Sequence, residues 1–204
     1  MSSDNFRTKS LRFDRGVSKG TWDRGLDPEA TKQMLLAHMA EAEDKALKGS
    51  KRARGRLAKL CVMLIQLENG SRVSEAREAF LAWLKLGRPG HIRKVRVRVR
   101  KQKKDPERRL IVIPSEVIDV SQRAGLKPED VGSKIAICCL AQRLGINTHS
   151  LRYAGITRMA LSGKMADVAI AKITGHRKIE ILMDYIQKVR AEKALEELVS
   201  GSRP

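Results

Sequence analysis

The sequence predicts a mostly helical α+β domain that carries one small antiparallel β-hairpin. Apolar residues recur with a helical period along most of the chain, and around residues 91–114 that period gives way to the alternation of strands. The chain has 204 residues, which suits one sizeable domain, or one domain with a short appendage. These observations set the fold class, and the individual elements follow in chain order.

The N-terminal segment, residues 1–26, is polar and basic and has no apolar periodicity. We expect a flexible arm that either contacts phosphates or is simply disordered. The main domain is expected to cover residues 27–204. Its first helix is predicted to begin with Asp27 as the N-cap and Pro28 at the first helical position, and to end near Leu47.

The second predicted helix has the clearest amphipathic pattern. Its apolar residues are spaced as on one helix face, up to Gly70, which is expected to end the helix. These residues are Leu57, Leu60, Cys61, Leu64 and Ile65. At about 100° per residue, Arg52, Arg56 and Lys59 fall on the opposite side. One face is therefore expected to pack in a core while the other carries positive charge.

A third helix, from about Ser74 to Leu86 with Ser71 or Ser74 as its cap, precedes the hairpin. The stretch "HIRKVRVRVRKQKKDPERRLIVIP" then alternates valine with arginine. The valines are Val95, Val97 and Val99, and the arginines are Arg96, Arg98 and Arg100. The turn "KQKKDPER" leads to a second strand, "RLIVIP". The pattern predicts a hairpin with one dry face and one strongly cationic face.

The rest of the chain returns to a helical pattern. Helices are expected at residues 116–124, 128–144, 149–161 and 167–174, with a last one around 190–200.

The charge of the chain restricts the class of partner. Lys and Arg number 42 against 23 Asp and Glu, which gives a net charge of +19. A polyanion is the expected partner, with nucleic acid ahead of an anionic membrane surface. No apolar run is long enough to span a bilayer. The 3 cysteines lie in apolar stretches without zinc-site spacing, which indicates reduced, buried thiols in a cytoplasmic protein and no metal.

Two polar residues stand close together at the start of one predicted helix. His149 and Arg152 are three residues apart and therefore share a helix face. Asn147 or Thr148 can cap the helix just before them. Free backbone N–H groups of the first turn also favour an anion, so a phosphate is the expected ligand.

An ordered set of motifs extends this site over much of the chain. Arg72 stands in "NGSRVSE", the hairpin turn contains "KQKK", "HSLR" follows, and "TGHRKIEILMDY" ends with a tyrosine nine residues after a histidine. In this order and spacing the chain resembles the tyrosine recombinase (phage integrase) family, over about residues 27–190.

The resemblance implies a site-specific DNA recombinase or integrase of a mobile element that needs no metal or cofactor. Arg72 and Arg152 would hold the non-bridging oxygens of a phosphodiester, and His176 would donate a further hydrogen bond to them. Tyr185 would attack the phosphorus and form a 3′-phosphotyrosine, with His149 as its base. The reaction class expected is metal-independent strand cleavage and rejoining.

A hairpin lysine would protonate the departing 5′ oxygen. The family pattern favours Lys103, with Lys101 next and Lys104 third. The remaining basic residues are expected to hold double-stranded DNA. These DNA-binding residues are Arg52, Arg56, Lys59, Lys101, Lys104, Arg177 and Lys178.

The chain also departs from the family pattern. The usual N-terminal helical domain is expected to be absent, so the chain is either a catalytic fragment or grips DNA with its basic arm and the face of Arg52, Arg56 and Lys59. Thr174 replaces a leucine, which reads as a mild change. Tyr153 is expected to turn away from the phosphate and to pack. By analogy, the amphipathic tail at 190–200 would dock on a neighbouring copy in a tetramer on DNA.

Two alternatives to a recombinase remain open. The first is an enzyme like a type IB topoisomerase or a telomere resolvase. The second is a non-catalytic DNA-binding module of the same fold.

Overall fold

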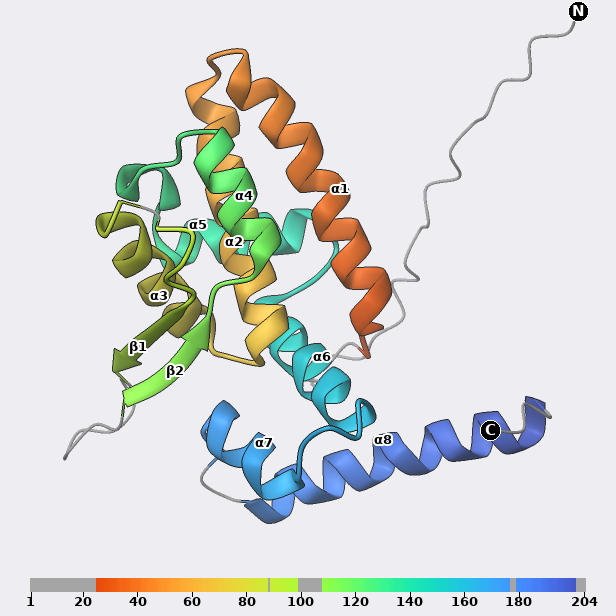
Figure 1. Ribbon diagram of the computed structural model, residues 1–204. Coiled ribbons are helices and arrows are strands. Elements are labelled where there is room, and N and C mark those ends of the chain that lie inside the picture. The colour runs from red at the N-terminus through yellow and green to blue at the C-terminus, as the bar shows by residue number, and fades with distance from the viewer. Residues whose placement is uncertain (1–24, 88, 99–107, 177–178, 201–204) are drawn as a thin grey trace, which may run out of the picture.

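The computed structural model describes residues 25–87, 89–98, 108–176 and 179–200 (Figure 1). These ranges form a mostly helical α+β fold with a two-stranded antiparallel sheet, which confirms the predicted fold class. The basic arm lies outside the described residues except for its last two positions. No helix of the described ranges is long and apolar enough to cross a membrane.

The centre of the fold is a pair of long helices, α1 (Pro28–Leu47) and α2 (Lys51–Asn69). Asp27 caps α1 as predicted, because its carboxylate accepts from the Ala30 N–H at 2.6 Å. Gly70 ends α2 in the left-handed conformation, at φ 55°. Most of α2 is buried, and it runs through the middle of the main core (Figure 1).

Helix α3 (Val73–Lys85) begins one residue earlier than predicted, and its N-cap is Arg72, not Ser71 or Ser74. No side chain of the described residues caps the first turn of α3, and the Glu75 carboxylate instead accepts from the N–H of the N-cap residue Arg72 at 3.1 Å.

The hairpin consists of β1 (Lys94–Arg98) and β2 (Arg108–Val112). Val95 and Val97 are buried and the basic residues of β1 are exposed, as predicted; Val99 and Arg100 lie outside the described residues. The second strand departs from the expected division of faces. Arg109 pairs with Val97 and is buried on the dry face, whereas Leu110 and Val112 are exposed on the cationic face.

The predicted helix at 128–144 is broken in two. After α4 (Ser115–Arg123), a short 3-10 helix η1 (Pro128–Val131) precedes α5 (Lys134–Arg143). Gly132 separates them with φ 68° and ψ −173°, a backbone conformation that glycine adopts readily and that does not occur within a helix. Ser133 then caps α5, and its hydroxyl accepts from the Ala136 N–H at 3.2 Å.

The last three helices are α6 (Thr148–Leu161), α7 (Asp167–Thr174) and α8 (Ile179–Ser200). Helix α8 starts eleven residues before the predicted 190–200 tail helix, so the backbone of Tyr185 lies within it. Figure 1 shows α6 leading away from the main body to α7 and α8, with the end of α8 projecting outward.

Helix α6 belongs to two apolar clusters. Its first half packs in the main core, while Ile156 and Met159 pack in a second cluster with residues of α7 and α8. A Cβ on Gly155 would lie 2.2 Å from the Leu67 carbonyl oxygen, so only glycine allows α6 to cross the end of α2 this closely.

Candidate functional site

Four predicted site residues come together where α3, α6 and α7 meet. Arg72 is the N-cap of α3, His149 and Arg152 lie in the first half of α6, and His176 follows the end of α7. Arg152 Nη2 lies 3.2 Å from His176 Nε2. The charges of Arg152, Arg72 and His149 all act to lower the pKa of His176, which reflects their proximity.

A buried carboxylate holds two of the site's cations. Glu75 is 2% exposed and accepts from Arg72 Nη1 at 2.9 Å. Its second oxygen accepts from Arg109 Nη1 at 2.5 Å. Glu75 therefore fixes two guanidiniums that come from different elements, one from the start of α3 and one from β2.

Arg109 is a site cation that sequence reasoning missed. Its side chain is buried, and its charge lowers the pKa of both Arg152 and His176. A Cβ on Gly175 would lie 1.4 Å from Arg109 Nη2, so the guanidinium occupies the space that any other residue at position 175 would fill. The alternation of side chains along the strand could have revealed it, because Arg109 lies on the same face as the buried Ile111 and opposite to Leu110.

Arg152 is the most deeply buried of the site's predicted cations, at 4% exposure. Its Nη2 donates to the Thr174 carbonyl at 2.7 Å, whereas its Nη1 is buried and has no hydrogen-bond partner among the described residues. Burial, followed by the charge of Arg72, lowers the pKa of Arg152 to about 10. A buried donor without an acceptor is costly, and an anionic oxygen would satisfy it.

Around this donor, three guanidiniums face one carboxylate. Arg72, Arg109 and Arg152 carry three positive charges, and Glu75 carries one negative charge. The remaining positive charge lies in a largely dry environment, where Coulomb interactions are strong. The arrangement is therefore suited to binding an anionic group with several oxygen acceptors.

Histidine rings line the same site. Burial, together with the charge of Arg152, lowers the pKa of His176 to about 4, so the imidazole is neutral at pH 7. The ring of Tyr153 lies 5.0 Å from His149 and 6.5 Å from His176, between centroids. Tyr153 therefore packs, as expected, and the rings that it packs against are those of two site residues.

Several predicted site residues lie outside the described part of the chain. They are Lys101, Lys103, Lys104, Arg177, Lys178 and the side chain of Tyr185. Among the described residues, no group of three or more His, Cys, Asp or Glu side chains could hold a metal ion.

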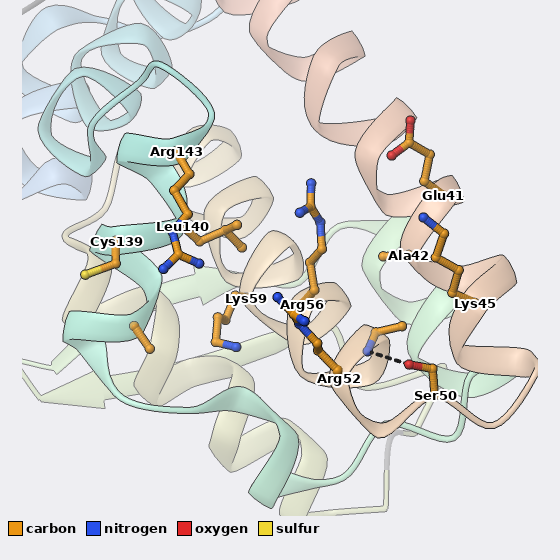
Figure 2. Close-up of a pocket in the computed structure, with 12 residues that line it drawn as sticks. Glu41, Ala42, Lys45, Ser50, Arg52, Arg56, Lys59, Cys139, Leu140 and Arg143 are labelled. Atoms are coloured by element: carbon orange, nitrogen blue, oxygen red, sulfur yellow. Dashed lines mark hydrogen bonds between the residues drawn. The ribbon is translucent and has the colours of Figure 1, made fainter.

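The predicted DNA-binding residues of α2 line a separate cleft of about 470 Å³ between α1, α2 and α5. Figure 2 shows Arg52, Arg56 and Lys59 directed into the same space as Arg143. Lys45 also lines the cleft. Burial, with the charge of Arg143, lowers the pKa of Lys59. Within the described ranges, none of these five cations pairs with a carboxylate.

The cleft and the first site lie at opposite ends of α2. Asn69 at the helix end lies thirteen positions after Arg56, which corresponds to about 20 Å at 1.5 Å per residue. Sequence reasoning found the residues on α2 but missed Lys45 and Arg143, because the packing of three helices brings them together. The exposed Cys139 also lines the cleft, which corrects the expectation that all the thiols are buried.

Comparison with known proteins gives three matches. The chain is 30% identical over 187 residues to "Putative integrase ORF241" of Acidianus two-tailed virus, covering 90% of this chain and 71% of that protein. It is 29% identical over 218 residues to "Putative integrase V10" of the Sputnik virophage, covering 91% and 93%. It is 31% identical over 201 residues to "Uncharacterized protein MJ0770" of Methanocaldococcus jannaschii, covering 88% and 89%. No protein-family model and no solved structure matches the chain.

Proposed function

Because the chain belongs to the family of "Putative integrase ORF241", and is thus an integrase-like protein, we propose that it is a site-specific DNA recombinase of the tyrosine type. One observation supports the chemistry most strongly. Glu75 pairs with Arg72 and Arg109, the charges of all three act on Arg152, and Arg152 Nη1 is a buried donor without a partner in the described structure. A phosphodiester provides the missing negative charge and the missing acceptor.

The arginines act more strongly on the transition state than on the bound substrate. A phosphodiester carries one negative charge, and its pentacovalent transition state carries more. Fixed guanidiniums in a dry site stabilise this additional charge without reorganising during the reaction. Glu75 contributes by holding Arg72 and Arg109 in place before DNA arrives.

The covalent step follows from this phosphate position. The phenol oxygen of Tyr185 attacks the phosphorus, and its proton passes to His149. The bond from phosphorus to the 5′ oxygen breaks, and a lysine of the hairpin turn protonates that oxygen. Lys103 is the first candidate for this lysine. The products are a 3′-phosphotyrosine and a free 5′-hydroxyl. Attack by a 5′-hydroxyl on the phosphotyrosine reverses the step and rejoins a strand.

The cleft between α1, α2 and α5 serves as a second DNA contact. Its cations are unpaired with carboxylates in the described structure, and Arg56 lies about 20 Å along α2 from the helix end that adjoins the proposed phosphate site. Phosphates of the duplex flanking the cleavage point fit this position. The cleft thus adds sequence-independent affinity and sets the register of the duplex.

The end of α8 provides a surface for assembly with other copies. Leu195, Leu198 and Val199 are 60%, 77% and 78% exposed. Burial of these side chains against a neighbouring copy would account for exposed apolar residues at the end of a helix that projects from the body (Figure 1). By analogy with the tyrosine recombinase family, the proposed assembly on DNA is a tetramer.

Trapping the covalent intermediate tests the proposed function. The protein is incubated with a library of nicked duplexes, from which a cleaved strand end is lost so that the adduct accumulates. The chain has 2 tyrosines, so Tyr153→Phe is a matched control for Tyr185→Phe. We expect an adduct with the wild type and with Tyr153→Phe, and none with Tyr185→Phe. An adduct that persists in Tyr185→Phe overturns the assignment.

Plasmid relaxation and DNA-binding assays separate the alternatives. Relaxation of supercoiled plasmid without sequence preference and without strand exchange indicates a topoisomerase. Salt-sensitive DNA binding without any adduct indicates a non-catalytic module.

The cleft is tested by replacing Arg52 and Arg56 with alanine. This double variant should weaken DNA binding and reduce its salt dependence. Arg123→Ala should leave both nearly unchanged, because Arg123 is exposed and already paired with Glu43. Equal losses in the two variants would remove the cleft from the DNA contact.

A further inference from the structure

The turn that ends α7 consists of Thr174, Gly175 and His176, and its first residue contacts both Arg152 and His176. Thr174 is fully buried. Its hydroxyl lies 2.7 Å from His176 Nδ1 and donates to the Ile170 carbonyl at 2.7 Å. Its own carbonyl accepts from Arg152 Nη2 at 2.7 Å.

The contacts on the two sides of the imidazole determine where its hydrogen lies. Arg152 has only donors, so His176 Nε2, at 3.2 Å from Arg152 Nη2, must present a lone pair. The single hydrogen of a neutral ring then resides on Nδ1. The Thr174 hydroxyl must accept this Nδ1–H, since its own hydrogen points to the Ile170 carbonyl. All three hydrogen bonds agree on one tautomer.

We propose that Thr174 is a positioning residue that fixes His176 in the Nδ1–H tautomer and directs Nε2 toward Arg152 and the bound anion. The inference rests on the proposed function only for the identity of that anion, a DNA phosphate. A leucine at position 174, as in the family pattern, has no acceptor for Nδ1–H and could not do this.

The fixed tautomer determines where a proton is taken up. Because Nδ1 already carries a hydrogen, a proton from solvent can bind only at Nε2. When an anion enters beside Arg152, its negative charge favours the imidazolium. Nε2–H then becomes a donor to an anion oxygen while Nδ1–H stays on Thr174. The hydroxyl therefore places the new donor on the side of the ring where Arg152 lies.

Two variants isolate the hydroxyl. Thr174→Val keeps the shape and the carbonyl but removes the acceptor, and Thr174→Ser restores the acceptor. The full-length protein carries ¹⁵N-labelled histidine, and the ring nitrogens of His176 are observed by NMR at pH 7 without DNA. We expect the Nδ1–H form in the wild type and in Thr174→Ser, and a shift toward Nε2–H in Thr174→Val. An unchanged Nδ1–H form in folded Thr174→Val overturns the proposal.

Titration of His176 in the presence of inorganic phosphate provides a second measurement, which does not depend on DNA. In the wild type and Thr174→Ser, phosphate should raise the pH at which His176 takes up its second proton. Thr174→Val should show a smaller shift. Equal shifts in all three proteins would also overturn the proposal, even if Thr174→Val proved less stable.

Adduct formation links the tautomer to the reaction. Loss of one oriented hydrogen bond should slow adduct formation by about 3- to 10-fold in Thr174→Val, with recovery in Thr174→Ser. A wild-type protein that shows the Nδ1–H tautomer but forms no adduct contradicts the proposed function and leaves the positioning role intact. The two failures are therefore distinguishable.

Discussion

Arg190 in α8 forms an ion pair with Asp167 at the start of α7, with 2.8 Å between Nη2 and Oδ1. The same guanidinium donates to the Ala160 carbonyl at 3.2 Å. These contacts tie the middle of α8 to the end of α6 and the start of α7. Tyr185 lies five residues earlier on the same helix, so the position of its backbone depends on this anchor.

The first prediction concerns this anchor. Arg190→Met should slow adduct formation at least about 10-fold, because a 1 Å misplacement of a reacting group costs up to about 100-fold. The free energy of unfolding should fall by only about 1 kcal/mol, since the pair is partly exposed. Lys193→Met is the matched control, as its pair with Glu197 lies farther along α8. Equal slowing in both variants would contradict a positioning role for the anchor.

The second prediction concerns the crossing of α6 and α2. Gly155→Ala should lower the free energy of unfolding by about 2–3 kcal/mol, because the added methyl group meets the Leu67 carbonyl. Gly55→Ala, in the interior of α2, should raise it by up to about 1 kcal/mol, since the new Cβ finds its nearest atoms at 3.6 Å. Urea unfolding measures both. If Gly155→Ala left the free energy of unfolding unchanged, α6 and α2 would have to move apart without loss of stability, which would contradict the prediction.

The third prediction concerns the shared carboxylate. Glu75→Gln should cost about 3–5 kcal/mol of unfolding free energy, because it leaves buried guanidiniums without their counter-ion. Added phosphate should restore part of this loss by binding the folded state. The exposed Glu41→Gln should change stability by less than about 0.5 kcal/mol. A thermal melt with and without phosphate checks both, and a Glu75→Gln protein as stable as the wild type would be the contrary result.

The fourth prediction concerns pH. The pKa of His176 is lowered from 6.5 to about 4, chiefly by burial, so between these values the unfolded chain binds a proton that the folded chain does not. The stability associated with neutral His176 is complete above about pH 6.5 and is lost as the pH falls toward 4. After discounting for partial exposure, the loss is on the order of 1–2 kcal/mol.

Urea unfolding at pH 7 and pH 5 measures this effect. The wild type should lose more stability than His176→Gln between these two conditions. His38→Gln is the control, because His38 lies on α1, away from the site. Identical losses in the wild type and His176→Gln would argue against a depressed pKa.

Local chemistry made much of the fold predictable. Asp27 and Gly70 mark helix ends because a cap hydrogen bond and a left-handed residue act within one turn. The break at Gly132 escaped prediction, since the apolar pattern continues on both sides of it and a lone glycine is tolerated in helices. The start of α8 escaped for a related reason, because its buried face is defined by contact with α6 and α7.

The candidate site was predictable to a smaller extent. The motif order indicated which of the described residues gather, namely Arg72, His149, Arg152 and His176. It could not indicate Arg109, whose partner Glu75 lies 34 positions away and is brought near only by the packing of β2 against α3. The interpretation of Thr174 as a mild change took no account of its hydrogen bonds, because a comparison of residue types carries no information on their direction.

Because the interior is divided into two apolar clusters, we expect two parts of the molecule to unfold at different temperatures. His176 follows a helix of the smaller cluster, which has seven buried apolar residues, while Arg72 and Arg109 lie on elements of the larger one. The smaller unit is expected to open first, on a hydrogen-exchange timescale, while the larger one remains protected. Inactivation should therefore precede the main loss of far-ultraviolet helix signal, and cooling should restore activity without refolding of the whole chain.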